Sequence, residues 1–337
     1  LKVTTIKDSL INEDVKNRIK KLIINFETEK IENENRILKI TQEKQLKLNR
    51  MQKLIITIIF AFLIFALLLL LTLHKLNKKL NNAYEEIKIS IEYAGKIQSA
   101  MLSSYNDILK HFREHVIFYK PAHTLSGDFY WAKKIKDTMF VAAGDSTGHG
   151  IPGALLSIAG MSYLDDNVYE DFIKPDVILN NMRNKIKYRL NQRGKLHEHK
   201  DGWDMSLISI NMKNLTVSFS GAYNSLYVIK ESDKTKKLIQ YKADRQPVAI
   251  HSNEKPFKRH NLKLNKGDII WMFTDGYKDQ LNPETMKKFT LKRLKELLLK
   301  ISDLPLKEQK DILKSEFIKW KGNYEQIDDI LLLGIKI

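Results

Sequence analysis

Four acidic sites in the chain could do chemistry together, because each places an aspartate beside a glycine or at the edge of an apolar run. They are Asp128, Asp145, Asp275 and the pair Asp328-Asp329. A single aspartate beside glycine commonly marks only a turn. If the four sites converge, however, their charges repel one another unless cations lie between them. Carboxylate oxygens favour Mg²⁺ or Mn²⁺, so the sequence indicates a hard divalent metal site.

The remaining composition narrows the chemistry further. The chain contains no cysteine, which excludes a disulfide scaffold, a thiolate zinc site and a cysteine nucleophile. His197 and His199 form the densest histidine cluster, but they lie in a polar stretch where we expect a loop and no metal site. The formal charge of +17 is spread along the chain. Because no basic stripe with interleaved aromatic residues is present, we expect no nucleic-acid binding.

A glycine-rich stretch at 144–157 joins an apolar run to an apolar helix. It contains Gly148, Gly150 and Gly153, with Pro152 at an early helical position. Exposed amides before a helix N-terminus favour an anion. The lysine and hydroxyl residue of a P-loop are absent, and a purely structural turn remains the alternative.

Short β-rich runs and amphipathic helices must position these residues. Their periodicity predicts strands at 115–119, 128–135, 139–143, 205–211, 216–220, 225–229, 238–241, 259–264, 268–274 and 330–337, and helices at 151–164, 175–191, 291–301 and 306–319. Strands and helices do not alternate regularly. We therefore predict an α+β layered domain and no Rossmann-type sheet.

The N-terminal third differs in composition from the rest of the chain. Leu54–Leu73 is a stretch of 20 residues without charge, which matches the thickness of a bilayer. After it, Leu73, Leu76, Leu80 and Ala83 recur at steps of three and four, as in a coiled coil, and predict a homodimer through this stalk. The predicted division is a helical segment at 1–53, a transmembrane helix at 54–73, a coiled-coil linker at 74–101 and one domain at 102–337. Because the chain begins at Leu1, we expect a fragment of a longer protein.

Six motifs together resemble the SpoIIE/RsbU-type branch of the metal-dependent protein phosphatase 2C family. They are SGDFYW, GDSTGHGIPGALLS, DGWDMSLISI, GAYNSLYVI, FTDGYKDQ and QIDDILLLGI, which occur in this order over residues 94–337. The resemblance implies an α-β-β-α sandwich with two Mn²⁺ or Mg²⁺ ions bound at one end, between the sheets.

The resemblance also implies roles for individual residues. Asp145 would bridge both metals, and the backbone carbonyl of Ser146 would bind one of them. Asp128 would serve the second metal, so Asp128 and Asp145 are the catalytic candidates. Asp275 and Asp328 would complete the first metal, with Asp329 the less favoured member of its pair. Asp201 and Asp204 would be structural or support the ligands. Thr147 stands where eukaryotic relatives place a histidine as candidate general acid, and Asn224 stands where some relatives have a third-metal aspartate.

The implied function is a membrane-tethered serine/threonine phosphatase. Its substrate would be a phosphorylated cytoplasmic signalling protein such as an anti-sigma-factor antagonist, and the domain after the span would face the cytoplasm. Lysines flank the span on both sides, so the positive-inside rule does not fix this orientation. A catalytically inactive, receptor-like scaffold with the same fold is the main alternative. A nucleotide cyclase is disfavoured, because three of the acidic sites would have no role in it.

Overall fold

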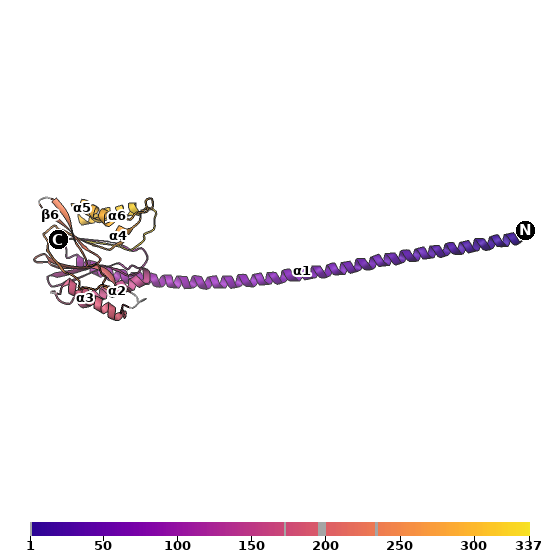
Figure 1. Ribbon diagram of the computed structural model, residues 1–337, viewed down its shortest axis with the longest axis horizontal. Coiled ribbons are helices and arrows are strands. Elements are labelled where there is room, and N and C mark those ends of the chain that lie inside the picture. The colour runs from indigo at the N-terminus through magenta and orange to yellow at the C-terminus, as the bar shows by residue number, and fades with distance from the viewer. Residues whose placement is uncertain (1, 172, 195–199, 233–234) are drawn as a thin grey trace. The chain divides into compact units, whose positions relative to one another are not determined.

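The N-terminal part of the chain forms one long helix, α1 (Lys2–Leu109), which Figure 1 shows in indigo to purple. The computed structural model describes residues 2–171, 173–194, 200–232 and 235–337. No glycine or proline precedes Gly95, so nothing in this sequence interrupts the helical backbone. The chain divides into two compact units, Leu1–Tyr84 and Glu85–Ile337.

Within the first unit, Leu54–Leu73 exposes its apolar side chains. Among the described residues, α1 is the one helix long and apolar enough to cross a membrane, on length and composition alone. Leu76 and Leu80 on the predicted coiled-coil seam are also exposed. Within the described residues, these two side chains therefore pack against no other part of the chain.

Within the second unit, α1 continues past the predicted domain boundary at residue 102. Gly95, Gln98, Leu102, Tyr105 and Leu109 recur at steps of three and four, and all are buried. This stripe packs on the unit's own core. The last turns of the predicted linker at 74–101 are therefore part of the folded unit.

Two five-stranded antiparallel sheets form the centre of this unit. The first has the order β1 (Glu114–Lys120), β10 (Ile330–Lys336), β9 (Ile269–Phe273), β6 (Leu226–Ser232) and β7 (Thr235–Tyr241). The second has the order β2 (Phe129–Ile135), β3 (Thr138–Ser146), β4 (Trp203–Asn211), β5 (Thr216–Ala222) and β8 (His260–Lys263).

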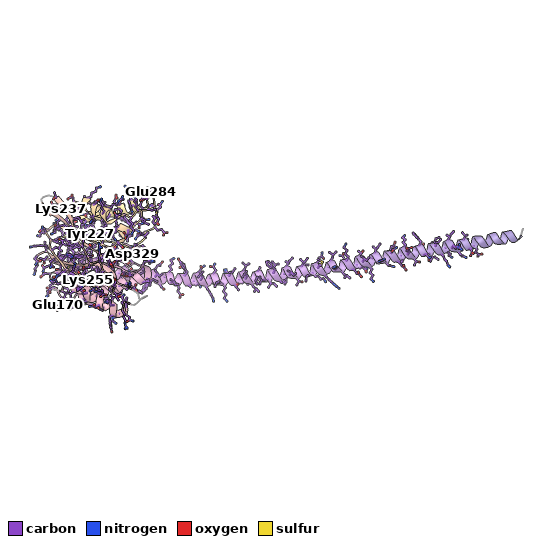
Figure 2. The ribbon with its side chains drawn as sticks, viewed as in Figure 1. Glu170, Tyr227, Lys237, Lys255, Glu284 and Asp329 are labelled. Carbon is purple, nitrogen blue, oxygen red and sulfur yellow. The ribbon has the colours of Figure 1, made fainter. Side chains whose placement is uncertain are left out.

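Helices cover both outer faces, as Figure 1 shows. One face carries α2 (Gly150–Asn167) and α3 (Pro175–Arg189). The other carries α5 (Leu291–Lys300) and α6 (Leu306–Lys321), with the short α4 (Gly276–Asp279) following β9. In Figure 2, Tyr227 and Asp329 lie between Glu284, on the side of α5 and α6, and Glu170, on the side of α2 and α3. The predicted α-β-β-α sandwich is confirmed.

The core has two layers, and β10 belongs to both. Leu331 and Leu333 point into the cluster between the sheets, whereas Ile330 and Leu332 point into the cluster under α5 and α6. Successive side chains of a strand face opposite sides, so a strand buried on both faces reads as a continuous apolar run. This is why the last strand could be recognised in the sequence.

The predicted strands and the four longer helices of this unit are all present, and two differences bear on the site. The sequence did not predict α4, a single turn after Asp275. In addition, β3 continues to Ser146 instead of ending at Ala143. Asp145 is therefore held inside the ladder, directly opposite Asp204 of β4.

Candidate metal centre

The four predicted acidic sites meet at one end of the sandwich. Asp128 lies immediately before β2, and Asp145 lies at the end of β3. Asp275 follows β9 and caps α4, while Asp328 lies just before β10. Because β2 pairs with β3 and β9 with β10, each sheet delivers two of these residues to the same end.

Burial and mutual repulsion raise the pKa values of these carboxyl groups. Burial raises the pKa of Asp145 to about 8, and the charges of Asp275, Asp328 and Asp204 add to the shift. Burial, followed by the charge of Asp145, raises the pKa of Asp128 well above its usual range. Burial is also the main cause of the raised pKa of Asp328. The cluster therefore holds more negative charge than the surrounding protein compensates.

Asp128 is held by hydrogen bonds that involve Thr274, Ser126 and Tyr119. Its Oδ2 accepts a hydrogen bond of 2.6 Å from the hydroxyl of Thr274, at the end of β9. Its backbone N–H donates to the Ser126 hydroxyl at 3.1 Å, and its carbonyl accepts from the Tyr119 hydroxyl at 3.3 Å. Within the described residues, the other carboxylate oxygen accepts no hydrogen bond from the protein, so it is available for another ligand.

The two neighbouring aspartates at the start of β10 have different environments. Both oxygens of Asp329 accept backbone hydrogen bonds of 2.7 Å, one from Ala122 and one from Gly127. A Cβ atom on Gly276 would clash with the backbone oxygen of Asp329, so this approach requires glycine. Asp328 instead lines the open hollow next to Asp145. The geometry thus assigns Asp329 to loop fixation and leaves Asp328 facing the site.

The glycine-rich stretch forms the rim of this hollow. The N–H of Ser146 donates to the carbonyl of Gly127 at 3.2 Å, and the N–H of Thr147 donates to the carbonyl of Gly202 at 3.0 Å. The Ser146 hydroxyl is buried and has no hydrogen-bond partner among the described residues. His149 lies on the rim with its ring centroid 5.6 Å from that of His123.

Two adjacent hollows open over the cluster and share Asp145 and Asp204. One, of about 340 Å³, is lined by Asp145, Ser146, Thr147, Gly148, His149, Asp204 and Asp328. The other, of about 320 Å³, adds residues that include Asn224, Asp275 and Lys278. The size and openness of these hollows suit a charged group that enters from solvent.

Asp204 is a residue for which the resemblance implied a structural or supporting role. It lines both hollows, and burial, followed by the charge of Asp275, raises its pKa to about 7. Its position at the start of a strand that pairs with the strand of Asp145 could have indicated that it lies at the site. Asn224 donates to the carbonyl of Asp204 at 3.0 Å and so supports it. His197 and His199 lie outside the described residues.

The donor set can be tested against a divalent metal. Among the described residues, no three histidine, aspartate or glutamate side chains form a ready-made metal-binding group. The side chains nonetheless fit a hard cation in chemistry. All are oxygen donors, they raise each other's pKa values, and cation binding would remove the repulsion that burial magnifies.

Comparisons with known proteins agree with this geometry. A family model described as Stage II sporulation protein E (SpoIIE) matches residues 136–337. The phosphoserine phosphatase RsbU of Bacillus subtilis (strain 168) is 25% identical over 205 residues, which cover 59% of this chain and 56% of RsbU. The chain therefore spans little more than half the length of that curated relative.

Solved structures extend the likeness to the fold. The SiaA-PP2C domain of Pseudomonas aeruginosa is 26% identical, with a TM-score of 0.66, over 76% of this chain and 98% of that domain. The phosphatase domain of SpoIIE from Bacillus subtilis, solved with a fragment of its regulatory domain, is 19% identical, with a TM-score of 0.52, over 66% of this chain and 63% of that structure. Since the family match covers more than half of the chain and includes Asp145, Asp275 and Asp328, the chain belongs to the SpoIIE family of protein phosphatase 2C-type domains.

Proposed function

We propose that this chain is a metal-dependent serine/threonine protein phosphatase anchored in a membrane by Leu54–Leu73. The observation that carries the proposal is the convergence of Asp128, Asp145, Asp275 and Asp328 at one end of the sandwich, beneath two open hollows. Such a cluster costs folding free energy unless a cation neutralises it. A protein that keeps such a cluster despite this cost is expected to use it as a functional site.

We assign two Mn²⁺ or Mg²⁺ ions to the cluster. Asp145 would bridge them, with the carbonyl of Ser146 and the carboxylates of Asp275 and Asp328 on one ion and Asp128 on the other. When bound, such ions acidify a water molecule and offset phosphoryl charge. The chain supplies no cysteine nucleophile, so direct attack by water on phosphorus is the reaction that these residues favour.

The protein's own residues orient this chemistry. Thr274 holds Asp128 by its carboxylate and Tyr119 holds it by its backbone carbonyl. The β3–β4 ladder holds Asp145 opposite Asp204. Lys278 Nζ lies 3.8 Å from Asp275 Oδ2 and partly compensates the charge at the edge of the hollow. Preorganisation of this kind avoids a reorganisation cost during the reaction.

The substrate class follows from the family. RsbU carries the name phosphoserine phosphatase, and we expect this chain to act on a phosphorylated signalling protein, with an anti-sigma-factor antagonist as the first candidate. Such substrates are cytoplasmic, so we place the domain after the span in the cytoplasm and residues 1–53 outside. The exposed seam at Leu76 and Leu80 supports a homodimer through the segment at 74–101.

A metal-dependent phosphatase assay of the full chain in detergent micelles tests the proposal. We expect phosphate release from phosphoserine and phosphothreonine peptides that requires Mn²⁺ or Mg²⁺ and is abolished by chelation. Asp145→Asn should lower the rate by at least about 100-fold. Asp311→Asn, which removes one exposed charge on α6, should leave it unchanged.

The same assay separates an enzyme from an inactive scaffold. Wild-type release no faster than that of Asp145→Asn, in the presence of calorimetrically measured Mn²⁺ binding, would establish a metal-binding scaffold without turnover. Release that persists after chelation would refute the metal assignment.

A further inference from the structure

The outer edge of β1 is unpaired. β1 is the edge strand of its sheet and pairs with β10 on one side only. No strand in the described part of the chain occupies its other side. Edge strands present N–H and C=O groups to solvent and act as templates for a further strand unless they are blocked. No proline or glycine interrupts residues Glu114–Lys120.

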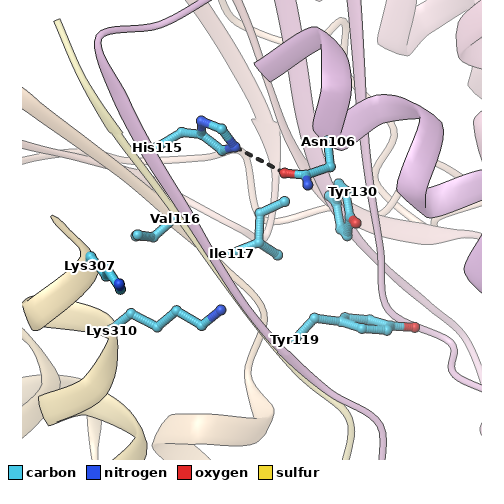
Figure 3. A pocket seen from close by; sticks show the side chains of 8 residues that line it. All are labelled: Asn106, His115, Val116, Ile117, Tyr119, Tyr130, Lys307 and Lys310. Carbon is cyan, nitrogen blue, oxygen red and sulfur yellow. Dashed lines mark hydrogen bonds between the residues drawn. The ribbon is translucent and has the colours of Figure 1, made fainter. Parts of the chain in front are cut away.

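A groove runs along this edge. A hollow of about 490 Å³ is lined by Asn106, His115, Val116, Ile117, Tyr119, Tyr130, Lys307 and Lys310. Figure 3 shows the two lysines of α6 on one side of β1 and Asn106 and Tyr130 on the other. His115 is held by a hydrogen bond of 2.9 Å to the amide oxygen of Asn106. The groove thus has two lysines on one wall, and Val116 and Ile117 contribute apolar side chains to its mixed lining.

A second hollow, of about 340 Å³, extends the groove past the beginning of β1. It shares His115 and Lys307 with the first and adds residues that include Lys110 and Arg113. Lys110 is already paired with Asp107 at 2.6 Å. No ion pair within the described residues involves Arg113, Lys307 or Lys310.

The carboxylates near the two α6 lysines either have other partners or lie outside both hollows. Glu114 accepts hydrogen bonds from the N–H of Leu306 at 2.9 Å and from Lys336 at 3.0 Å. Glu308 and Asp311 of α6 do not line either hollow. Burial, followed by the charge of Lys110, lowers the pKa of His115.

We propose that the groove binds an acidic, extended segment of a partner protein, which adds to the sheet as a strand beside β1. The spacing fits. Residues on one face of a strand repeat at about 6.6 Å, and Lys307 and Lys310 lie three residues apart on a helix, which separates side chains by about 5–6 Å. Acidic residues at alternate positions then face the lysines, and the intervening residues face Ile117, Tyr119 and Tyr130.

The groove also shares a residue with the surroundings of the metal centre. Tyr119 lines the groove and donates its hydroxyl to the carbonyl of Asp128 at 3.3 Å. A segment bound along β1 would therefore lie next to the residue that holds Asp128. Docking of the segment needs no phosphate hydrolysis, so its test does not depend on the proposed phosphatase activity.

The test is fluorescence anisotropy on the full chain in detergent micelles. The probe is a fluorescein-labelled peptide that alternates glutamate with valine and threonine over eight residues, and the comparison peptides carry lysine for glutamate or a central proline. We expect the acidic peptide to bind, the lysine peptide not to bind, and the proline peptide to bind at least about tenfold more weakly, because proline cannot donate to the ladder.

Variants locate the binding. The double variant Lys307→Glu/Lys310→Glu should weaken binding at least about tenfold. Lys319→Glu, an exposed lysine on the same helix that lines neither hollow, should not. Asp145→Asn should bind like wild type, which keeps docking distinct from the metal centre. Thermal unfolding of each variant confirms that it is folded.

Four results would overturn the proposal. One is equal binding of the acidic and lysine peptides, and another is an unchanged affinity in the Lys307→Glu/Lys310→Glu variant. Equal binding of the proline peptide would mean charge attraction without strand pairing. Displacement of the acidic peptide by inorganic phosphate alone, at constant ionic strength, would indicate a simple anion site in place of a strand-binding groove.

Discussion

Replacing Gln98 with methionine should uncouple α1 from the loop that carries Asp128. Gln98 is 3% exposed. Its Nε2 donates to the Ser126 carbonyl at 2.7 Å and to the Ser157 hydroxyl at 2.8 Å. Its Oε1 accepts from the Ser126 N–H at 3.1 Å. One side chain therefore ties α1, α2 and the loop before β2 together.

The expected cost follows from these contacts. Methionine has a similar length and volume, so packing changes little. Ser126 is fully buried, and its N–H would lose its hydrogen-bond partner. An unsatisfied buried donor costs about 1–3 kcal/mol. With the two donated bonds also lost, we expect the free energy of unfolding of the C-terminal unit to fall by about 2–4 kcal/mol. Because the loop before β2 then moves more freely, half-maximal activity should also require more Mn²⁺.

Urea unfolding followed by tryptophan fluorescence measures this change. All 4 tryptophans lie after residue 130, so the signal reports the C-terminal unit alone. Ser103→Ala is the matched control, since Ser103 is exposed on the same helix and, among the described residues, its hydroxyl donates only to the carbonyl of Ser99. A Gln98→Met unfolding free energy within about 0.5 kcal/mol of wild type, with unchanged Mn²⁺ dependence, would refute the reasoning.

Three further predictions concern the site and the anchor. Asp328→Asn should abolish Mn²⁺ binding in calorimetry with little loss of stability. Asp329→Asn should instead lower the unfolding midpoint, because the two backbone hydrogen bonds that its side chain accepts weaken. The reverse pattern would exchange the roles of the two residues. In metal-free protein, burial holds the pKa of Asp145 near 8, so the folded state binds more protons than the unfolded chain and stability should fall as pH rises from about 4 to 8; urea midpoints that rise over this range would contradict the repulsion argument. Deleting Leu54–Leu73 should move the protein from the membrane to the soluble fraction on centrifugation, and retention in the pellet as folded protein would argue against a span.

Local sequence patterns were sufficient to predict most of the fold, because the spacing of apolar residues reflects which side chains are buried. The alternating burial of Glu114–Lys120 and the apolar run Ile330–Leu333 reflect strands packed on one or both faces. The proline at the start of α3 and the apolar face of α2 likewise mark helices that cover a sheet. The single turn α4 escaped prediction, since four residues carry no detectable period.

By itself, the sequence determined which residue types are available for chemistry and where the chain is apolar enough for a membrane. Aspartates at strand ends and the charge-free Leu54–Leu73 are visible without coordinates because both are local properties. Tertiary structure alone decided that Asp204 faces Asp145, that Asp329 fixes loops while Asp328 faces the hollow, and that α1 packs into the domain from Gly95 onward. Each of these depends on strand register or on backbone donors far away in the chain, and a short-range pattern contains neither.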